Sequence, residues 1–219
     1  MSAVRPFLFI PALLFVLVSS GTNAHAADPL EAFSKNKVMP DQYRKQILTA
    51  LSYFPELENV HIVFRIAPQY TPFTTRPNLV GIFKRKNHRT YVITISNKTI
   101  DTLTPLLMQN LSFDAQVGVI GHELSHVVDF NHMNFFQNLW NGLGHLSEKH
   151  LDKMEFNTDR ICVMHGLGAY LEVYSKYVRQ MMHVQYWRGV DHVFEPNASH
   201  ERYMNPGTIE KYMTMAAHQ

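Results

Sequence analysis

Cysteine is almost absent from this sequence, because Cys162 is the only one among 219 residues. A lone cysteine excludes a disulfide bond within the chain, and its neighbours Ile161 and Val163 indicate a buried structural thiol. An excess of charge of one sign is also missing, since 20 Lys and Arg are balanced by 18 Asp and Glu. The sequence has no basic stripe, so we expect no nucleic-acid partner.

The sequence also lacks an apolar run of the roughly 20 residues that a membrane-spanning helix needs. Its N-terminal apolar run, residues 7–18, follows Arg5 and precedes a small-x-small site at residues 24–26. This order is typical of a secretory signal peptide. We therefore expect a signal peptide over residues 1–26, a single domain over residues 27–219, a secreted or periplasmic protein, and no stable membrane span after cleavage. The oligomeric state is not indicated.

Hydrophobic periodicity divides the remaining chain into a strand-rich first half and a helical second half. We expect an irregular lead-in over residues 28–39, a helix over 40–54, strands over 59–67, 79–84 and 90–96, a long helix from about 147–151 to 182 with a break at 166–168, and a short helix from Thr208. The prolines of residues 68–77 predict a loop, and the polar residues 85–89 predict a hairpin. The strand over 90–96 is a candidate cleft rim, to which an extended peptide could add as another strand.

The pattern His122-Glu123-Leu124-Ser125-His126 lies between these halves and is an H-E-x-x-H motif. Positions i and i+4 share one face of a helix, so both histidines can reach one zinc ion. Glu123 projects beside such a metal, where a general base takes a proton from a water. Because the chain has 13 histidines, a chance match has to be weighed against the surrounding sequence.

The surrounding sequence predicts that the motif lies on a buried helix. Apolar residues recur at positions 113, 117, 120, 124 and 127, nearly opposite the two histidines at about 100° per residue. A further strip of Gly118, Gly121 and Ser125 is small enough to let another backbone approach. Buried polar side chains need partners, which favours a metal site over a core helix with hydrogen-bonded histidines.

A hydrolytic zinc site usually has a third protein ligand, and two residues compete for this role. Glu155 and Asp159 are spaced i and i+4 on the later helix, so Glu155 can bind the metal while Asp159 accepts the outer N–H of a ligand histidine. His132 is the alternative, because it follows His126 at the spacing of metzincin proteases. Those proteases have glycine where this chain has Asp129, and no convincing Met-turn follows, so we favour Glu155.

With these five residues (His122, Glu123, His126, Glu155 and Asp159) in place, the chain resembles the gluzincin metallopeptidases over residues 113–182. It is also similar to small secreted bacterial gluzincin-like proteins of unassigned function. The resemblance implies a minimal zincin-like α+β fold, in which a small, mostly antiparallel sheet packs on the H-E-x-x-H helix and the C-terminal half is predominantly helical. It further implies one Zn²⁺ per chain and hydrolysis of peptide bonds in a peptide or protein substrate.

The resemblance also implies an oxyanion-stabilising donor beyond the third ligand, for which His200 and Tyr203 are our candidates. Their rivals are His165, His183, Tyr186 and Arg202. Two other functions stay open beside a secreted zinc peptidase. One is a non-catalytic secreted protein that binds zinc or a partner, and the other is a latent peptidase whose residues 131–150 cover the cleft.

Overall fold

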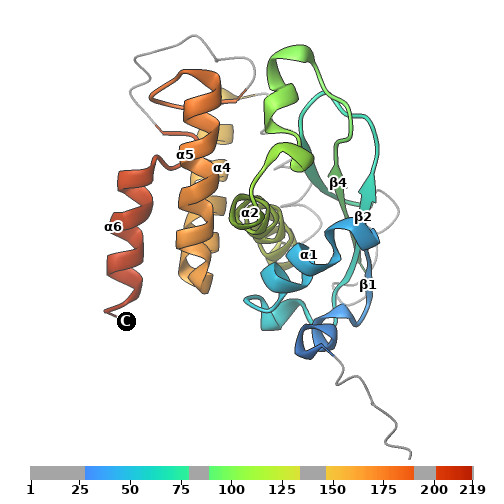
Figure 1. The fold of residues 1–219 in the computed structure, drawn as a ribbon. Coiled ribbons are helices and arrows are strands. Elements are labelled where there is room, and N and C mark those ends of the chain that lie inside the picture. The colour runs from blue at the N-terminus through green and yellow to red at the C-terminus, as the bar shows by residue number, and fades with distance from the viewer. Residues whose placement is uncertain (1–27, 79–88, 134–146, 190–200, 219) are drawn as a thin grey trace, which may run out of the picture.

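The structure is a computed structural model that describes residues 28–78, 89–133, 147–189 and 201–218 (Figure 1). The predicted signal peptide, the predicted strand over 79–84, most of the segment 131–150 and His200 lie outside the described residues. Within the described ranges, no helix is both long enough and apolar enough to cross a membrane.

The fold is α+β with one small sheet, and this sheet is mixed rather than mostly antiparallel. Its strands are β1 (Lys37–Val38), β2 (His61–Ile66), β3 (Phe73–Pro77) and β4 (Thr90–Ile95), in the order β1-β2-β4-β3. β2 runs parallel to both β1 and β4, and only the β3–β4 pair is antiparallel. The expectation of a mostly antiparallel sheet was wrong because α1 (Arg44–Leu51) crosses over between β1 and β2, a connection that yields parallel strands.

β3 occupies part of the segment that we had expected to be a loop. Its last residue, Pro77, lacks a backbone N–H, but β3 is an edge strand among the described residues, where this loss is tolerated. β3 is the antiparallel partner of β4. β3 is the strand in most contact with the motif helix, and β4 lies inside the sheet between β2 and β3 rather than at its rim.

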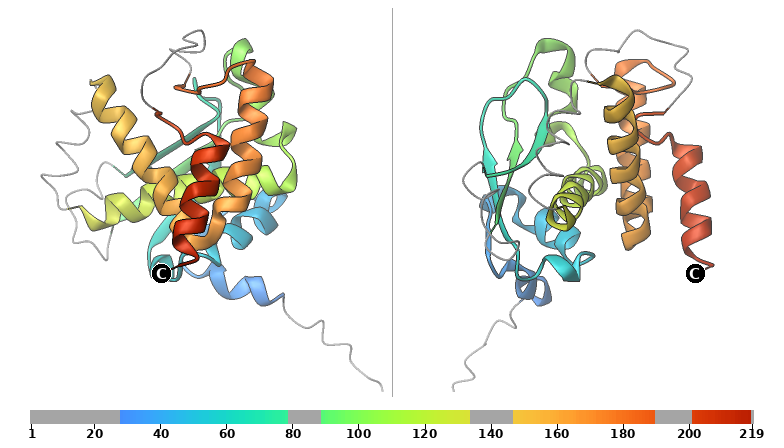
Figure 2. Two further views of the ribbon diagram at one scale, coloured as in Figure 1. Left: turned by 90° about the vertical axis from the view of Figure 1, so that its left-hand side faces the viewer. Right: turned by 180° about the vertical axis from the view of Figure 1, so that it is seen from behind.

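The helix α2 (Phe113–His132) carries the motif and lies between the sheet and the C-terminal helices, as Figures 1 and 2 show. On its other side are α4 (Glu148–Cys162) and α5 (Gly168–Met182), and α6 (Pro206–Ala216) packs outside α5. The described residues also form short helical turns: η1 (Pro29–Ser34), η2 (Asp41–Tyr43), η3 (Pro55–Leu57), η6 (Asp101–Leu106), η7 (Met108–Asn110) and the π-helical turn η8 (Val163–Leu167).

The small residues of α2 allow the close approach that their spacing predicted. A Cβ at Gly118 would lie 2.3 Å from the backbone oxygen of Tyr170, so the backbones of α2 and α5 touch there. At the predicted break, Gly166 has φ = 88°, a left-handed conformation that suits glycine. This kink separates α4 from α5, and both helices then border the motif face of α2. Cys162 is buried at the end of α4, as predicted.

Candidate metal centre

Three side chains from two helices converge on one point. His122 and His126 come from α2, Glu155 comes from α4, and their possible ligand atoms all lie within 4.8 Å of one another. Glu155 Oε2 is 3.2 Å from His122 Nε2 and 3.3 Å from His126 Nε2. With bonds of about 2.0–2.1 Å to a tetrahedral zinc, two ligand atoms are expected about 3.3 Å apart. The spacing therefore fits a small tetrahedral cation.

Glu155 Oε2 is also a buried atom without a hydrogen-bond partner. Burial would raise the pKa of Glu155, but the attraction of His126 and His122, whose Nε2 atoms lie close to Oε2, outweighs burial and lowers that pKa strongly. The carboxylate is thus ionised in an apolar interior, where an unpaired charge is costly. A cation held by these three residues would supply the missing partner.

Hydrogen bonds on the far side of each ring leave both Nε2 atoms available. The Thr158 hydroxyl donates its one proton to Met154 O at 3.0 Å, so it accepts from His126 Nδ1 at 3.2 Å. Asp159 Oδ1 accepts from His122 Nδ1 at 2.7 Å. With Nδ1 protonated on both rings, each Nε2 of a neutral histidine presents its lone pair to the centre.

The electrostatics at His122 favour a positive charge. Burial would lower the pKa of His122, but the hydrogen bonds and charges of Asp159 and Glu155 raise it well above its ordinary value. The same two carboxylates that favour a proton on this ring also favour a metal cation beside it. Thr158, which the sequence analysis did not single out, acts on His126 as Asp159 acts on His122.

Glu123 lies at the same centre but does not join the three ligands. Its Oε2 accepts a 2.6 Å hydrogen bond from Thr75 Oγ1 on β3. Within the described residues its other oxygen, Oε1, makes no hydrogen bond, and it is not sealed from solvent. One carboxylate oxygen is therefore fixed and the other is free to meet a water. Sequence reasoning missed Thr75, because its segment was expected to be a loop.

His132 does not reach this centre. α2 continues without a turn through Asp129 and ends at His132. Six residues of helix place His132 about 9 Å further along the axis than His126. Among the described residues, the group that can hold a metal consists of His122, His126 and Glu155.

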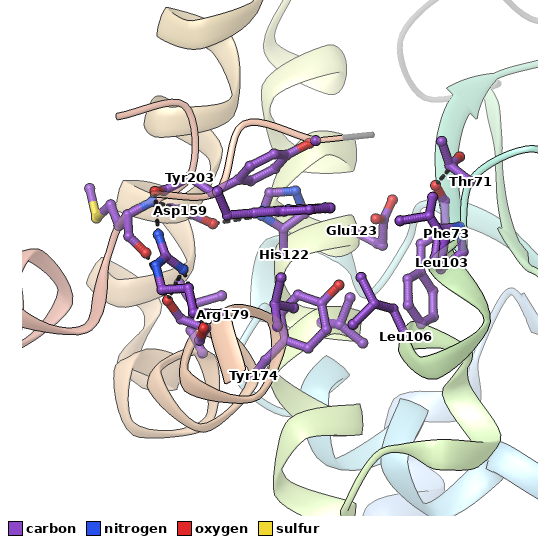
Figure 3. A pocket seen from close by; sticks show the side chains of 18 residues that line it. Thr71, Phe73, Leu103, Leu106, His122, Glu123, Asp159, Tyr174, Arg179 and Tyr203 are labelled. Atoms are coloured by element: carbon purple, nitrogen blue, oxygen red, sulfur yellow. Dashed lines mark hydrogen bonds and ion pairs between the residues drawn. The ribbon is translucent and has the colours of Figure 1, made fainter. Parts of the chain in front are cut away.

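Two cavities flank Glu123. The first, of about 260 Å³, is open to the three candidate ligands and is bordered by Thr74 and Thr75 of β3. The second, of about 110 Å³, lies behind Glu123 and is mostly apolar (Figure 3). The apolar residues that line it include Leu103, Leu106, Leu171, Tyr174, Val178 and Trp187. Phe73 and Tyr203 border both cavities, so the two spaces adjoin.

Tyr203 is the one oxyanion candidate that the described residues bring to the centre. Its ring centroid is 5.8 Å from that of His122, and burial together with the charge of Glu155 raises its pKa well above the ordinary value. The phenol thus stays protonated and can donate. The rivals lie elsewhere: His165 binds Glu56 and Ile161 O, Arg202 binds Asp152 and Glu148, and His183 and Tyr186 line neither cavity.

Side chains of α4 and α5 hold the segment around Tyr203 in place. Met204 N donates to Asp159 Oδ2 at 2.7 Å, and Met204 O accepts from Ser175 Oγ at 2.9 Å. Arg179 Nη2 donates to Tyr203 O at 3.0 Å. The position of Tyr203 over the centre therefore follows from both helices, although 40 residues separate it from the end of α4 in the sequence.

Comparisons of the chain with family models, with curated proteins and with solved structures find no match.

Proposed function

We propose that this chain is a secreted zinc-dependent hydrolase of peptide bonds. The observation that carries the proposal is the spacing of three buried ligand atoms at a tetrahedral edge length, with an unpartnered oxygen of Glu123 in the same cavity. His122, His126 and Glu155 would hold zinc and leave room for a water, and the metal would then supply Lewis acidity and lower the pKa of that water. Structural zinc sites use four closed ligands, often cysteines, so this donor set favours catalysis over a purely folding role.

The residues of the chain divide the chemical work as follows. Glu123 takes a proton from the attacking water with its free oxygen and passes it to the leaving amine. Tyr203, whose phenol keeps its proton, donates a hydrogen bond to the oxygen of the carbonyl under attack. Asp159 and Thr158 keep the two histidine rings in the orientation and tautomer that the metal needs.

The edge of β3 supplies a place for an extended substrate. Hydrogen bonds from Ser96 N to Pro72 O and from Asn78 N to Thr90 O show that the even-numbered residues of β3 pair with β4. The backbone groups of Phe73 and Thr75 therefore point toward the free edge, beside the cavity that holds the three ligands. A peptide that adds there as a strand would pass over Glu123.

The apolar cavity behind Glu123 would receive a side chain of that peptide next to the bond that is cut. Its apolar lining favours a large aliphatic or aromatic side chain over a charged one. The proposed activity is that of a gluzincin-type peptidase. Its support is the H-E-x-x-H motif and the geometry of Glu155 and Asp159 around it.

The test combines metal content with turnover. The purified mature protein should contain about one zinc ion, measured by plasma mass spectrometry. Glu155→Ala should lose the metal, while His132→Ala serves as the control that keeps it. Glu123→Gln should retain zinc and lose cleavage of a broad peptide library.

The possible results separate the competing functions. Zinc binding without any Glu123-dependent cleavage would point to a non-catalytic zinc protein. Loss of zinc in His132→Ala would mean that His132, and not Glu155, is the third ligand. Absence of zinc even after reconstitution would mean that α2 is only a core helix.

A further inference from the structure

We propose that Thr75 is a positioning residue for Glu123, and that it couples the place where substrate docks to the orientation of the general base. The inference rests on the proposed function, because it gives Glu123 the role of base. Its physical basis is the contact between the edge strand β3 and the motif helix α2.

The Thr75 hydroxyl has one proton and two acceptors within reach. Glu123 Oε2 lies 2.6 Å away and the backbone oxygen of Glu123 lies 3.3 Å away. The contact to Oε2 is shorter and therefore stronger, so it takes the proton. Since Thr75 holds Oε2, the carboxylate cannot rotate freely. Oε1 is left without a hydrogen-bond partner among the described residues, at a residue that lines the cavity.

The backbone N–H and C=O of Thr75 also point toward the edge of β3 along which a peptide would bind. In a strand the side chain stands perpendicular to the sheet, while the backbone N–H and C=O lie in its plane. The side chain of Thr75 thus reaches α2, and its backbone groups point to the free edge of β3. A peptide bound along β3 would therefore be aligned against the same residue that fixes the base.

A merely structural role for Thr75, as a link between β3 and α2, predicts a different outcome from a positioning role. Thr75→Val removes the hydroxyl while it keeps the β-branched shape and the preference for a strand. Thr75→Ser restores a hydroxyl in a smaller side chain. Thr90→Val is the matched control, because Thr90 lies on β4 with its hydroxyl 3.0 Å from His61 Nδ1 and lines neither cavity.

We expect Thr75→Val to lower kcat on the order of tenfold to a hundredfold, as a base displaced by about 1 Å would. KM and zinc content should stay close to those of the wild type, Thr75→Ser should recover most of kcat, and Thr90→Val should behave as the wild type. Crystal structures of the variants give a second readout: the Glu123 carboxylate should turn away in Thr75→Val and keep its place in Thr75→Ser.

The inference is overturned if Thr75→Val keeps the wild-type kcat, if Thr75→Ser is as impaired as Thr75→Val, or if Glu123 does not move in Thr75→Val. Failure of the proposed function looks different. In that case the zinc-loaded wild type, and not only the variants, would show no cleavage that depends on Glu123. The crystallographic comparison would still decide whether Thr75 orients the carboxylate.

Discussion

Asp159 and His122 are joined by a 2.7 Å hydrogen bond between Oδ1 and Nδ1. The second oxygen of Asp159 accepts the backbone N–H of Met204, the residue after Tyr203. One buried carboxylate thus orients a metal-binding ring and fixes the segment that places a phenol over the same centre.

Asp159→Asn should weaken zinc binding about tenfold to a hundredfold. An asparagine can accept from only one of the two N–H groups, so its amide N–H₂ must face either His122 Nδ1–H or Met204 N–H. The measurement is competition for zinc with a chelator of known affinity. Asp101→Asn, at an exposed aspartate of η6, is the control. Equal zinc affinity in Asp159→Asn and the wild type would mean that Asp159 does not orient His122 for metal binding.

Trp187→Ala should change the choice of substrate. Trp187 is buried and lines the apolar cavity behind Glu123. Its removal enlarges this space, so the ratio of kcat/KM for a substrate with Trp beside the cut bond to one with Leu should rise on the order of tenfold. The control is Tyr70→Ala, at an exposed aromatic residue that lines neither cavity. An unchanged ratio would mean that the substrate side chain does not enter the cavity.

The motif helix and the convergence of Glu155 on its two histidines could be predicted because their signals are local. His122, His126 and Glu155 obey helical spacing within α2 and α4, and Gly118 shows where another backbone comes close. The resemblance to gluzincins predicted that the glutamate helix follows the motif helix in the sequence. The two glycines, Gly166 and Gly168, predicted the break between α4 and α5.

The arrangement of the sheet could not be predicted, because it depends on contacts distant in sequence. β2 pairs directly with β4 although β3 lies between them in the sequence. The prolines around β3 suggested a loop, but they suit an edge strand. Thr75 and Thr158 were missed for a related reason. A hydroxyl that binds a carboxylate or an imidazole from another element has no spacing rule that would reveal it.

Secretion should leave a chain that begins at Ala27. The proposal follows from the positive residue, the short apolar run and the small-x-small site of the first 26 residues. N-terminal sequencing of the protein recovered outside the cytoplasm, after expression from the full-length sequence, is the measurement. Ala26→Asp should slow processing. A mature protein that keeps Met1 or Ser2 would contradict both the signal peptide and the proposed location.

The ionisation of Asp152 should make the free energy of unfolding depend on pH. Burial would raise its pKa, but hydrogen bonds from Arg202 and Arg188 outweigh this and hold the pKa below its ordinary value of 3.8. Because the folded pKa is the lower one, the carboxylate stabilises the fold above about pH 3.9, and this contribution is lost as the pH falls through the folded pKa.

Asp152→Asn should therefore lower the free energy of unfolding at pH 7 on the order of 1–3 kcal/mol. The difference from the wild type should close as the pH falls to about 3 and below. Urea unfolding in the presence of a chelator measures it without a contribution from metal loss. A difference that stays constant across this range would mean that the charge of Asp152 is not what stabilises the cluster.

Gly118→Ala tests the packing of α2 against α5. The added methyl carbon would lie 2.3 Å from Tyr170 O and 2.5 Å from Tyr170 C, which are backbone atoms that cannot move without shifting α5. Overpacking of this kind costs about 1–3 kcal/mol, against a gain of about 1 kcal/mol from the better helix propensity of alanine.

The matched control is Gly207→Ala in α6, where the new Cβ meets only Asn205 Oδ1 at 3.5 Å. Denaturant unfolding should show a net loss of stability for Gly118→Ala and none for the control. Because α5 also carries Arg179 and Ser175, which hold the Tyr203 segment, the same variant should lower turnover. If Gly118→Ala were as stable and as active as Gly207→Ala, α5 could not lie as close to the motif helix as this structure places it.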